Sequence, residues 1–485
     1  MKLYDKLVDY SKTNIYPMHM PGHKRNEKVM DMINPYSIDI TEVEGFDNLF
    51  HADDILKACM ERAASLYKSQ YCNYLIGGSS AGILSGISAC TKKGDKVLLT
   101  RDCHKSVYNA IYINELKPIY IYPQINNEYG INCGTCPKSI KEMLKEYKDI
   151  KLIIITSPTY EGVVSDINRI SQIAHEHNIP LLVDEAHGAH LGFNNYFPPN
   201  SISLGADITI HSLHKTLPSF TQTGLIHVKS NLVDYEKVKY YLSIYQSTSP
   251  SYILMSSIDK CINLLLEEKE DLFYSYSNRL IKFYKRMGKL KSLKVIFKEN
   301  KDFYMFDPSK IVVSTRNTNL SGKDLYDILL EDYKIQVEMS STDYIIAMTS
   351  ICDTDEGFKR LADALLEIDN ETSNSKIIKN PNISSDKTNK ATYKPQLYSK
   401  LTRETKIDRS SYEAINSKLE SIPFSKSAGR VVGEYIYLYP PGIPVLVPGE
   451  VISENHIIYL QKCKELGLSV QGPEDYNLNY IKVTV

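Results

Sequence analysis

The chain has 485 residues and a formal net charge of −1, with 57 basic against 58 acidic residues. This length exceeds what a single hydrophobic core usually supports, so we expect two or three domains. The balanced charge provides no attraction toward nucleic acid or an anionic membrane, and neither is expected as a partner.

Targeting and redox features favour the cytoplasm. Residues 1–6 contain no apolar core of a signal peptide, and no apolar run is long enough to cross a bilayer. The nine cysteines are an odd number and lie mostly inside apolar segments, which is typical of reduced thiols rather than of a disulfide framework. We therefore expect a cytoplasmic protein without a membrane partner.

Strands and helices alternate in the first half of the chain. An amphipathic helix is predicted over 53–70, with Asp53 as its cap. Helical patterns such as 167–177 separate most of the short apolar segments that follow. This alternation predicts an α/β fold with a mostly parallel sheet covered by helices on both faces. The predicted strands are 74–76, 96–99, 119–122, 152–156, 181–184, 208–211 and 225–228.

From about Val233 a long helical region leads into a smaller α/β lobe, with strands predicted at 310–314 and 344–348 and a helix at 354–368. A polar segment rich in Asn, Ser and Lys follows, and its composition is typical of a linker. The last part of the chain alternates apolar residues with prolines and glycines and is predicted to be a small compact domain. The predicted division is 1–52, 53–300, 301–370, 371–391 and 392–485.

A lysine and an aspartate each follow or end a buried strand. Lys215 lies just beyond the segment 208–211, and burial there lowers the pKa of its amine toward a nucleophilic form. Asp184 ends another apolar strand, while Ser212 and His214 precede the lysine. Pyridoxal phosphate (PLP) requires an amine for a Schiff base, a carboxylate for its ring nitrogen and donors for its phosphate. The sequence therefore predicts a PLP site.

A glycine-rich turn and a histidine add to this prediction. The turn at 77–82 follows a strand and opens a helix, so that Gly78, Ser79 and Ser80 combine free N–H groups with two hydroxyls suited to a phosphate. The alternative is an ordinary helix cap, and the turn alone does not decide between the two. His104 follows the strand 96–99 and is suited to stacking on an aromatic ring.

Two other readings of the Asp184 segment are weaker. Residues 184–187 spell the DEAH box of helicases, which requires a phosphate loop of the form GxxxxGK[ST], and the chain contains none. Asp184, His187 and His190 could form a metal site, but their spacing is not that of a zinc ligand set, and no metal is expected.

An acidic segment near the N-terminus includes Glu44 and Asp47. Acidic residues before a helix are commonly a solvated loop, because they interact favourably with the helix dipole. The same carboxylates could instead balance the charge of a cationic substrate, and spacing favours the solvated loop without deciding the question.

The ordered motifs resemble one family, the PLP-dependent ornithine/lysine/arginine decarboxylases of the aspartate-aminotransferase fold, which is fold type I. Each match alone is weak, but together they run from near the N-terminus to the last domain. The matching stretches are MPGHK at 20–24, HKS at 104–106, SPTY at 157–160, VDEAHG at 183–188, SLHK at 212–215, STSPSY at 247–252, YPPGIP at 439–444 and PGE at 448–450.

The resemblance implies a role for each matched residue. Lys215 corresponds to the Schiff-base lysine, Asp184 to the partner of the ring nitrogen and His104 to the histidine that stacks on the ring. Lys215 or His214 would protonate the substrate's Cα. Further cofactor contacts are implied for Gly78, Ser79, Ser80, His187, Ser212 and His214, and candidate contacts to the substrate's distal cation are Glu44, Asp47 and Glu450.

The resemblance also implies an activity and an assembly. The chain is similar to the short form of the family, which lacks an N-terminal response-regulator-like domain, and this form favours decarboxylation of arginine to agmatine for polyamine synthesis. Lysine and ornithine remain alternatives. So do an aminotransferase, for which Arg430 is a candidate carboxylate clamp, and a non-catalytic paralogue. A homodimer or larger homo-oligomer is expected, with residues 1–52 contributing to substrate and dimer contacts.

Overall fold

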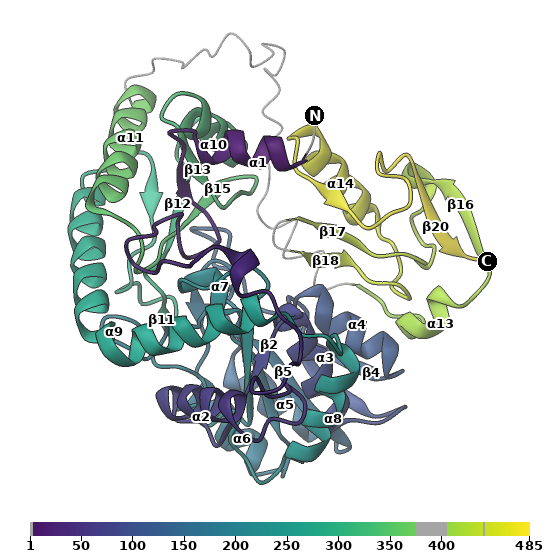
Figure 1. Cartoon of the computed structure of the whole chain (residues 1–485). Helices are drawn as coiled ribbons and strands as arrows, with labels where there is room; N and C mark the ends of the chain where they lie inside the picture. Colours follow the sequence, from purple (N-terminus) through teal and green to yellow (C-terminus); the bar gives the residue numbers. More distant parts are fainter. Residues whose placement is uncertain (1–2, 374–404, 440–441) are drawn as a thin grey trace.

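The computed structural model describes residues 3–373, 405–439 and 442–485. Figure 1 shows a large domain at the bottom of the view, a second lobe at the upper left and a C-terminal domain at the right. The N-terminal segment, in purple, runs along both the large domain and the second lobe. The predicted domain boundaries stay predictions.

The large domain is built on a seven-stranded sheet of order β2-β9-β8-β7-β5-β3-β4. Each predicted strand is present, although several boundaries differ by a few residues. All strands run in the same direction except β9, which is antiparallel to both neighbours. In sheet order the strands are Tyr71–Leu75, Gly224–Val228, Ile208–His211, Leu181–Asp184, Ile150–Thr156, Lys96–Thr100 and Lys117–Ile121.

Helices cover both faces of this sheet, because successive strand residues point to opposite sides. In β5, Leu152 and Ile154 belong to one apolar core, and Ile153 and Ile155 belong to another. The first core includes helices α3 (Gly78–Cys90), α4 (Lys105–Ile113) and α8 (Tyr235–Tyr245), and the second includes α5 (Pro137–Glu146) and α6 (Ile167–His175). The predicted α/β fold with a covered, mostly parallel sheet is confirmed.

Helix α2 (Ile55–Tyr67) begins differently from the prediction. Asp53 does not cap it, and the N-cap residue Asp54 makes no capping bond with its side chain. Instead the carboxylate of Asp47 accepts hydrogen bonds from the backbone N–H groups of Asp53, Asp54 and Leu56 at 3.2, 3.1 and 3.0 Å. Asp47 therefore satisfies donors that the start of a helix leaves unpaired.

The second lobe follows the long helix α9 (Tyr252–Met287). Its sheet has the order β10-β12-β15-β14, and the predicted strands at 310–314 and 344–348 are β12 and β15. Strand β1 of the N-terminal segment pairs in parallel with β13 of this lobe. The bounds are β1 Tyr16–Met18, β10 Lys294–Val295, β12 Lys310–Ser314, β13 Ile335–Val337, β14 Met339–Ser340 and β15 Tyr344–Met348, with helices α1 Leu3–Ser11, α10 Gly322–Glu331 and α11 Asp355–Ser373.

Helix α11 is longer than the predicted helix 354–368 and includes residues 371–373. These residues were expected to begin the polar linker, so that boundary is wrong. The remainder of the predicted linker, to residue 391, lies outside the described residues.

The C-terminal domain has its own apolar core, which includes Phe424, Val432, Ile436 and Leu460. Two small antiparallel sheets and helix α14 (Glu454–Glu465) surround this core. The other elements are α13 Ser411–Ile415, β16 Leu419–Pro423, β17 Ile436–Leu438, β18 Ile443–Leu446, β19 Val470–Gln471 and β20 Tyr480–Thr484.

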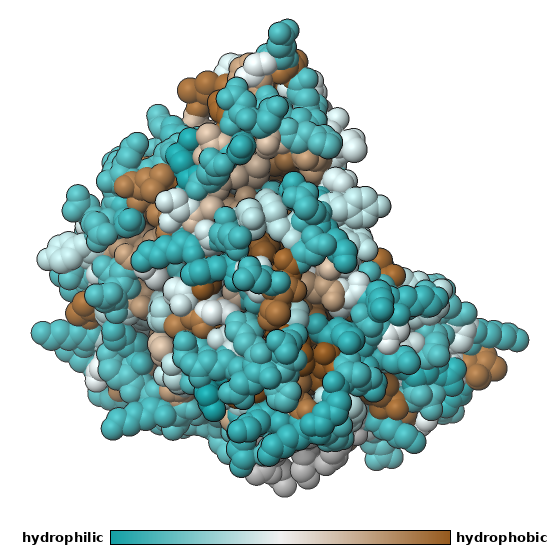
Figure 2. Space-filling model, turned by 90° about the horizontal axis from the view of Figure 1, so that it is seen from below, coloured by the Kyte–Doolittle hydropathy of each residue, from teal (hydrophilic) through white to brown (hydrophobic). Residues whose placement is uncertain are grey.

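The surface in Figure 2 is mostly hydrophilic, with hydrophobic side chains in separate patches. In the N-terminal segment, Leu3, Tyr4 and Tyr36 are 74%, 76% and 93% exposed. Within the described part of the chain, no helix combines the length and the apolar character needed to cross a membrane.

Candidate active site

Lys215 lies on α7 (Leu213–Thr216), a single helical turn directly after β8. Its Nζ is 2.9 Å from Nε2 of His187. Burial lowers the pKa of Lys215, and burial also places the pKa of His187 well below its ordinary value. A neutral imidazole accepts a hydrogen bond from the lysine, so the geometry holds the amine in one orientation.

Asp184 is the last residue of β7, which neighbours β8 in the sheet. Its side chain is buried, and Oδ1 accepts a hydrogen bond from the Ala186 N–H at 3.1 Å. Burial raises the pKa of this carboxyl group. Because no residue in the described ranges forms an ion pair with Asp184, the carboxylate is suited to a cationic group that enters the site.

The glycine-rich turn and Ser212 lie at the same edge of the sheet. Strands β2 and β8 flank β9, and their last residues, Leu75 and His211, pair with Gly224 and Leu225. The N-terminus of α3 follows the end of β2, and Ser212 follows the end of β8. Only β9 lies between these two strands.

This edge has the features of an anion site. Gly78 has φ of +70°, which an L side chain rarely adopts. The half-buried Ser79 and Ser80 form the first turn of α3. The buried hydroxyl of Ser212 has no hydrogen-bond partner among the described residues. Free N–H groups and an unsatisfied hydroxyl fit a phosphate group.

His104 is the N-cap of α4 and contacts the C-terminal domain. Its Nδ1 accepts from the Ser106 N–H at 3.2 Å and from the Ser106 hydroxyl at 2.8 Å. Burial, together with the charge of Lys215, lowers the pKa of His104 to about 3. The carbonyl of Gly442 accepts from the Lys105 N–H at 3.2 Å, and a Cβ at Gly442 would lie only 3.4 Å from His104 Nε2.

His214 lies beside Lys215 on α7. Its Nδ1 donates to the carbonyl of Thr223 at 2.8 Å, since a carbonyl can only accept. Burial lowers the pKa of His214 to about 4. The imidazole is therefore neutral near pH 7. Its one N–H proton is on Nδ1, so Nε2 carries none.

A buried charge network supports the backbone of His187. Lys310 is fully buried, and its Nζ donates to the His187 carbonyl at 3.0 Å, to Asp307 at 2.9 Å and to the Ser309 hydroxyl at 3.0 Å. His190 contacts the other oxygen of Asp307 at 3.1 Å. Sequence reasoning missed this network, although a lysine at the start of an apolar strand was a visible signal.

The alternative of a metal site at Asp184, His187 and His190, which the sequence made unlikely, is not supported by the contacts of these residues. His190 is engaged with Asp307, and His187 is engaged with Lys215. Among the residues that the structure describes, no group of three or more His, Cys, Asp or Glu side chains could hold a metal ion.

Glu338, between β13 and β14 of the second lobe, is a further residue beside the lysine. Its Oε1 accepts from the Tyr160 hydroxyl at 2.7 Å, and its Oε2 accepts from the Met20 N–H at 2.8 Å. The Tyr160 ring packs against His187, with centroids 4.7 Å apart. Glu338 has no local motif around it, so sequence reasoning could not have selected it.

Glu450 has internal partners in the structure. Arg101 binds both of its oxygens, with Nε at 3.1 Å and Nη2 at 3.0 Å, and the Val447 N–H donates at 2.8 Å. Both charged side chains are almost fully buried. The charge of Glu450 is already balanced, so this carboxylate is a poor candidate for a substrate cation.

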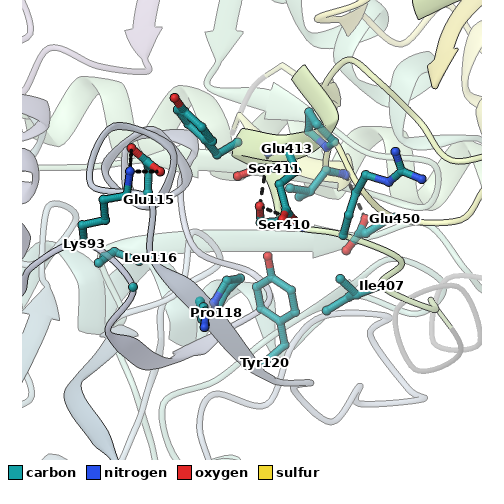
Figure 3. Close-up of a pocket in the computed structure, with 16 residues that line it drawn as sticks. Lys93, Glu115, Leu116, Pro118, Tyr120, Ile407, Ser410, Ser411, Glu413 and Glu450 are labelled. Atoms are coloured by element: carbon teal, nitrogen blue, oxygen red, sulfur yellow. Dashed lines mark hydrogen bonds and ion pairs between the residues drawn. The ribbon is translucent and has the colours of Figure 1, made fainter. Parts of the chain in front are cut away.

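A cavity of about 430 Å³ lies between β4 and the C-terminal domain, and Glu450 is at its edge. Figure 3 shows Tyr120 pointing into this cavity toward Ser410. Neither Lys215 nor Asp184 lines it, so this cavity is separate from the site built around the lysine.

The remaining sequence candidates have other surroundings. Glu44 is exposed, and Asp47 binds the start of α2. Arg430 forms an ion pair with Glu420 and donates to the carbonyl of Thr484 at 3.0 Å, within the C-terminal domain. Arg430 therefore has partners of its own and is a poor candidate for a carboxylate clamp.

Two family profiles match the chain in order. The profile of the Orn/Lys/Arg decarboxylase major domain matches residues 2–311, and the profile of the Orn/Lys/Arg decarboxylase C-terminal domain matches residues 390–474. The chain belongs to the Orn/Lys/Arg decarboxylase family. The resemblance stated from the motifs is confirmed, and this is a family of PLP-dependent enzymes.

Full-length relatives and solved structures agree with this assignment. The chain is 32% identical over 490 residues to the arginine decarboxylase of Bacillus anthracis, with 99% of this chain and 96% of the relative covered. The arginine decarboxylase of Bacillus subtilis (strain 168) is also 32% identical, with 99% and 97% covered. The solved structure of a Francisella novicida lysine decarboxylase has a TM-score of 0.78 at 20% identity, covers 99% of this chain and is itself 80% covered. This likeness confirms the fold-type-I architecture.

Proposed function

We propose that this Orn/Lys/Arg decarboxylase family member uses PLP to convert arginine into agmatine and CO2, for polyamine synthesis. The observation that carries the proposal is the half-buried Lys215, whose amine lies 2.9 Å from Nε2 of His187, with the buried carboxyl group of Asp184 at the end of the neighbouring strand. The choice of arginine is supported by the full-length relatives that bear that name.

The residues present fit PLP. The orphaned hydroxyl of Ser212 and the first turn of α3, with Ser79 and Ser80, suit its phosphate. Asp184 suits its protonated ring nitrogen, and His104 suits the face of its ring. When bound, PLP supplies an electron sink that withdraws electron density from the substrate's Cα as CO2 leaves.

The chain's own groups have distinct tasks in this proposal. The lowered pKa of Lys215 favours the uncharged amine, the form that would hold PLP covalently, and His187 would orient this amine by accepting a hydrogen bond from it. Asp184 would bind the protonated ring nitrogen. Gly442 of the C-terminal domain lies beside His104, where an added Cβ would be 3.4 Å from the ring nitrogen Nε2.

Proton transfer to Cα is assigned to Lys215 rather than to His214. His214 has a pKa of about 4, and its one proton is held by the Thr223 carbonyl, so it has none to deliver near pH 7. With substrate bound in place of the lysine, the Lys215 amine would be free, and with the proton that the substrate's α-ammonium group gives up it would serve as the proton donor to Cα.

Replacement of the lysine is the first prediction. Lys215→Ala is expected to abolish CO2 release from arginine, because it removes the amine that contacts Nε2 of His187, and to remove the visible absorbance of cofactor attached to lysine. Lys93→Ala, at an exposed lysine, is the matched control and should behave like the wild type. Continued turnover by Lys215→Ala would contradict the mechanism.

The same assay identifies the reaction and the substrate. Rates of CO2 release from arginine, lysine and ornithine are compared at equal concentrations. A preference for lysine or ornithine would overturn the choice of arginine while leaving decarboxylation intact. Formation of a keto acid instead of CO2 would indicate an aminotransferase.

We also propose a cytoplasmic homodimer or larger homo-oligomer. All nine cysteines are free in the structure, as is typical of a reducing compartment. The exposed Leu3, Tyr4 and Tyr36 of the N-terminal segment support association, because a second copy would remove apolar surface from water. Light scattering of the pure protein tests the oligomer, and a monomer would contradict it.

A further inference from the structure

A buried histidine and glutamate join the ends of strands β7 and β8. Glu185 directly follows Asp184, the last residue of β7. His211 is the last residue of β8 and directly precedes Ser212. Because a carboxylate can only accept, Nε2 of His211 donates to Oε2 of Glu185, at 2.8 Å, and the two side chains are 0% and 2% exposed. Each member of the pair is therefore the chain neighbour of a residue that we assign to the cofactor.

The pair extends the connection between the two strands beyond their backbone ladder. The last residues that pair across β7 and β8 are Asp184 and Ile210. One residue further, the Glu185 N–H donates to the Ile210 carbonyl at 3.0 Å. Both strands end at this point, and the hydrogen bond between the side chains of Glu185 and His211 is a further link between them.

Other contacts fix both side chains in one orientation. The Ser201 hydroxyl donates to Oε1 of Glu185 at 2.6 Å, and the Ser201 N–H lies 3.1 and 3.2 Å from the two carboxylate oxygens. The His211 ring packs against the ring of Tyr67, with centroids 4.9 Å apart. Apolar residues of similar volume are often at least as stabilising as a buried pair of ionisable side chains. Stability alone therefore does not account for a pair at this position.

A second histidine and carboxylate join the same two strands at their opposite ends. Asp207 precedes β8, and its Oδ2 accepts from the N–H of Leu181, the first residue of β7, at 2.7 Å. The same oxygen lies 2.9 Å from Nε2 of His175. Since β7 has four residues, this second pair is about 10 Å from the strand ends that carry the candidate site. It provides a matched control for the first pair.

We propose that Glu185 and His211 form a positioning pair, which holds Asp184 and Ser212 at the separation at which one PLP molecule contacts both. This inference rests on the proposed function, because it requires PLP as the cofactor, but it does not depend on which basic amino acid is the substrate. Asp184 is assigned to the ring nitrogen and Ser212 to the phosphate, which are two ends of one rigid molecule. Contacts of this kind require side chains held to within about 0.5 Å by the residues behind them.

The test compares PLP with pyridoxal, which lacks the phosphate. Both are titrated into the full-length protein freed of cofactor, and binding is followed by the visible absorbance of the aldehyde attached to Lys215. The ratio of the Kd of pyridoxal to the Kd of PLP measures what the phosphate contributes. A variant that is partly unfolded weakens both ligands by the same factor and leaves this ratio unchanged. The ratio therefore separates positioning from stability.

Three variants change one histidine each. His211→Leu removes the hydrogen bond to Glu185 and retains an apolar side chain beside Tyr67. His211→Gln is the conservative variant, because its amide can still donate to Glu185. His175→Leu makes the same change in the pair at the opposite ends of the strands.

We expect His211→Leu to lower the ratio about tenfold, which corresponds to the loss of one hydrogen bond to the charged phosphate. His211→Gln and His175→Leu should each change the ratio less than about threefold. If His211→Leu does not fold, Glu185→Gln takes its place, because it keeps an oxygen for Ser201 and loses the carboxylate oxygen that His211 binds. The same fall in the ratio is expected.

An unchanged ratio in the folded variant, or an equal fall in His175→Leu, would overturn the inference. A wild type that binds PLP and releases no CO2 from any basic amino acid would overturn the proposed function and leave the positioning pair intact. A wild type that does not bind PLP would overturn both.

Discussion

At the scale of single residues, Arg101 and Glu450 show how a partner decides what a charged side chain does. The pair is 4% and 2% exposed, joins the large domain to the C-terminal domain and is bidentate. Arg101 also donates to the carbonyl of Pro444 at 2.8 Å. Removing one member of such a pair leaves a buried charge without compensation.

Glu450→Gln is therefore expected to destabilise the protein by about 3–5 kcal/mol, because the Arg101 guanidinium stays buried. The free energy of unfolding is measured by urea titration. The double variant Arg101→Met/Glu450→Leu serves as the comparison and should recover most of the loss, since it removes both charges. A single variant as stable as the wild type would show that the pair contributes little.

The sequence could not have found this pair. The two residues are 349 positions apart, and the motif around Glu450 indicates only that the residue matters. The same applies to Asp47, whose carboxylate bonds the start of α2. Lys215, Asp184 and Ser212 were predictable because each follows a recognisable apolar strand, and the order of strands in a parallel sheet places such ends together.

At the scale of elements, the start of α14 depends on a neutral histidine. The Ser453 N–H and hydroxyl donate to Nδ1 of His456 at 3.0 and 2.8 Å, and the hydroxyl in turn accepts from the His456 N–H. Burial lowers the pKa of His456 from 6.5 to about 4. Protonation of Nδ1 removes the acceptor on which this cap relies.

This predicts an acid-sensitive C-terminal domain. Between pH 6.5 and about pH 4, His456 is protonated in the unfolded chain but not in the folded chain. The free energy of unfolding therefore falls as the pH decreases through this window. The contribution is at most about 3 kcal/mol, at 1.36 kcal/mol for each pKa unit. His456→Gln keeps an acceptor that does not titrate. Unfolding measured from pH 7 to pH 4 should depend less on pH in this variant, and parallel curves would contradict the prediction.

Strands and helices were predicted correctly where the apolar pattern is strong. The direction of β9 and the end of α11 were not predicted. The seven strands of the large sheet are recognisable from their buried apolar runs. The antiparallel direction of β9 is not, because a fully buried strand has the same apolar pattern whether it is parallel or antiparallel to its neighbours. The longer α11 was missed because its last turn is polar.

At the scale of the whole molecule, the site draws on all three bodies. Lys215 and Asp184 belong to the large domain, Glu338 to the second lobe, and Gly442 to the C-terminal domain. The part from the large domain was predictable from local motifs. The contributions of the other two bodies depend on how they dock, which no local pattern encodes.

Cofactor binding is consequently expected to stabilise the whole protein. A ligand that binds only the folded form adds about 2.7 kcal/mol at a free concentration of 100 Kd. We expect PLP to raise the Tm of the cofactor-free protein by several degrees in a thermal scan. Pyridoxal without phosphate is the control for the role of Ser212 and the first turn of α3, and it should raise Tm less. Equal shifts would contradict the proposed phosphate site.

The pairing of β1 with β13 has a consequence for synthesis on the ribosome. Met18 pairs with Val337, and the Met20 N–H donates to Glu338. The N-terminal segment is therefore synthesised long before the residues of the second lobe with which it pairs. At about 5–20 residues per second the delay is roughly 15–60 s, during which the large domain can fold while the N-terminal segment remains exposed. Glu338 thus joins the site only after most of the chain has emerged, so a nascent chain can hold Lys215 before the N-terminal segment has its partner in the second lobe.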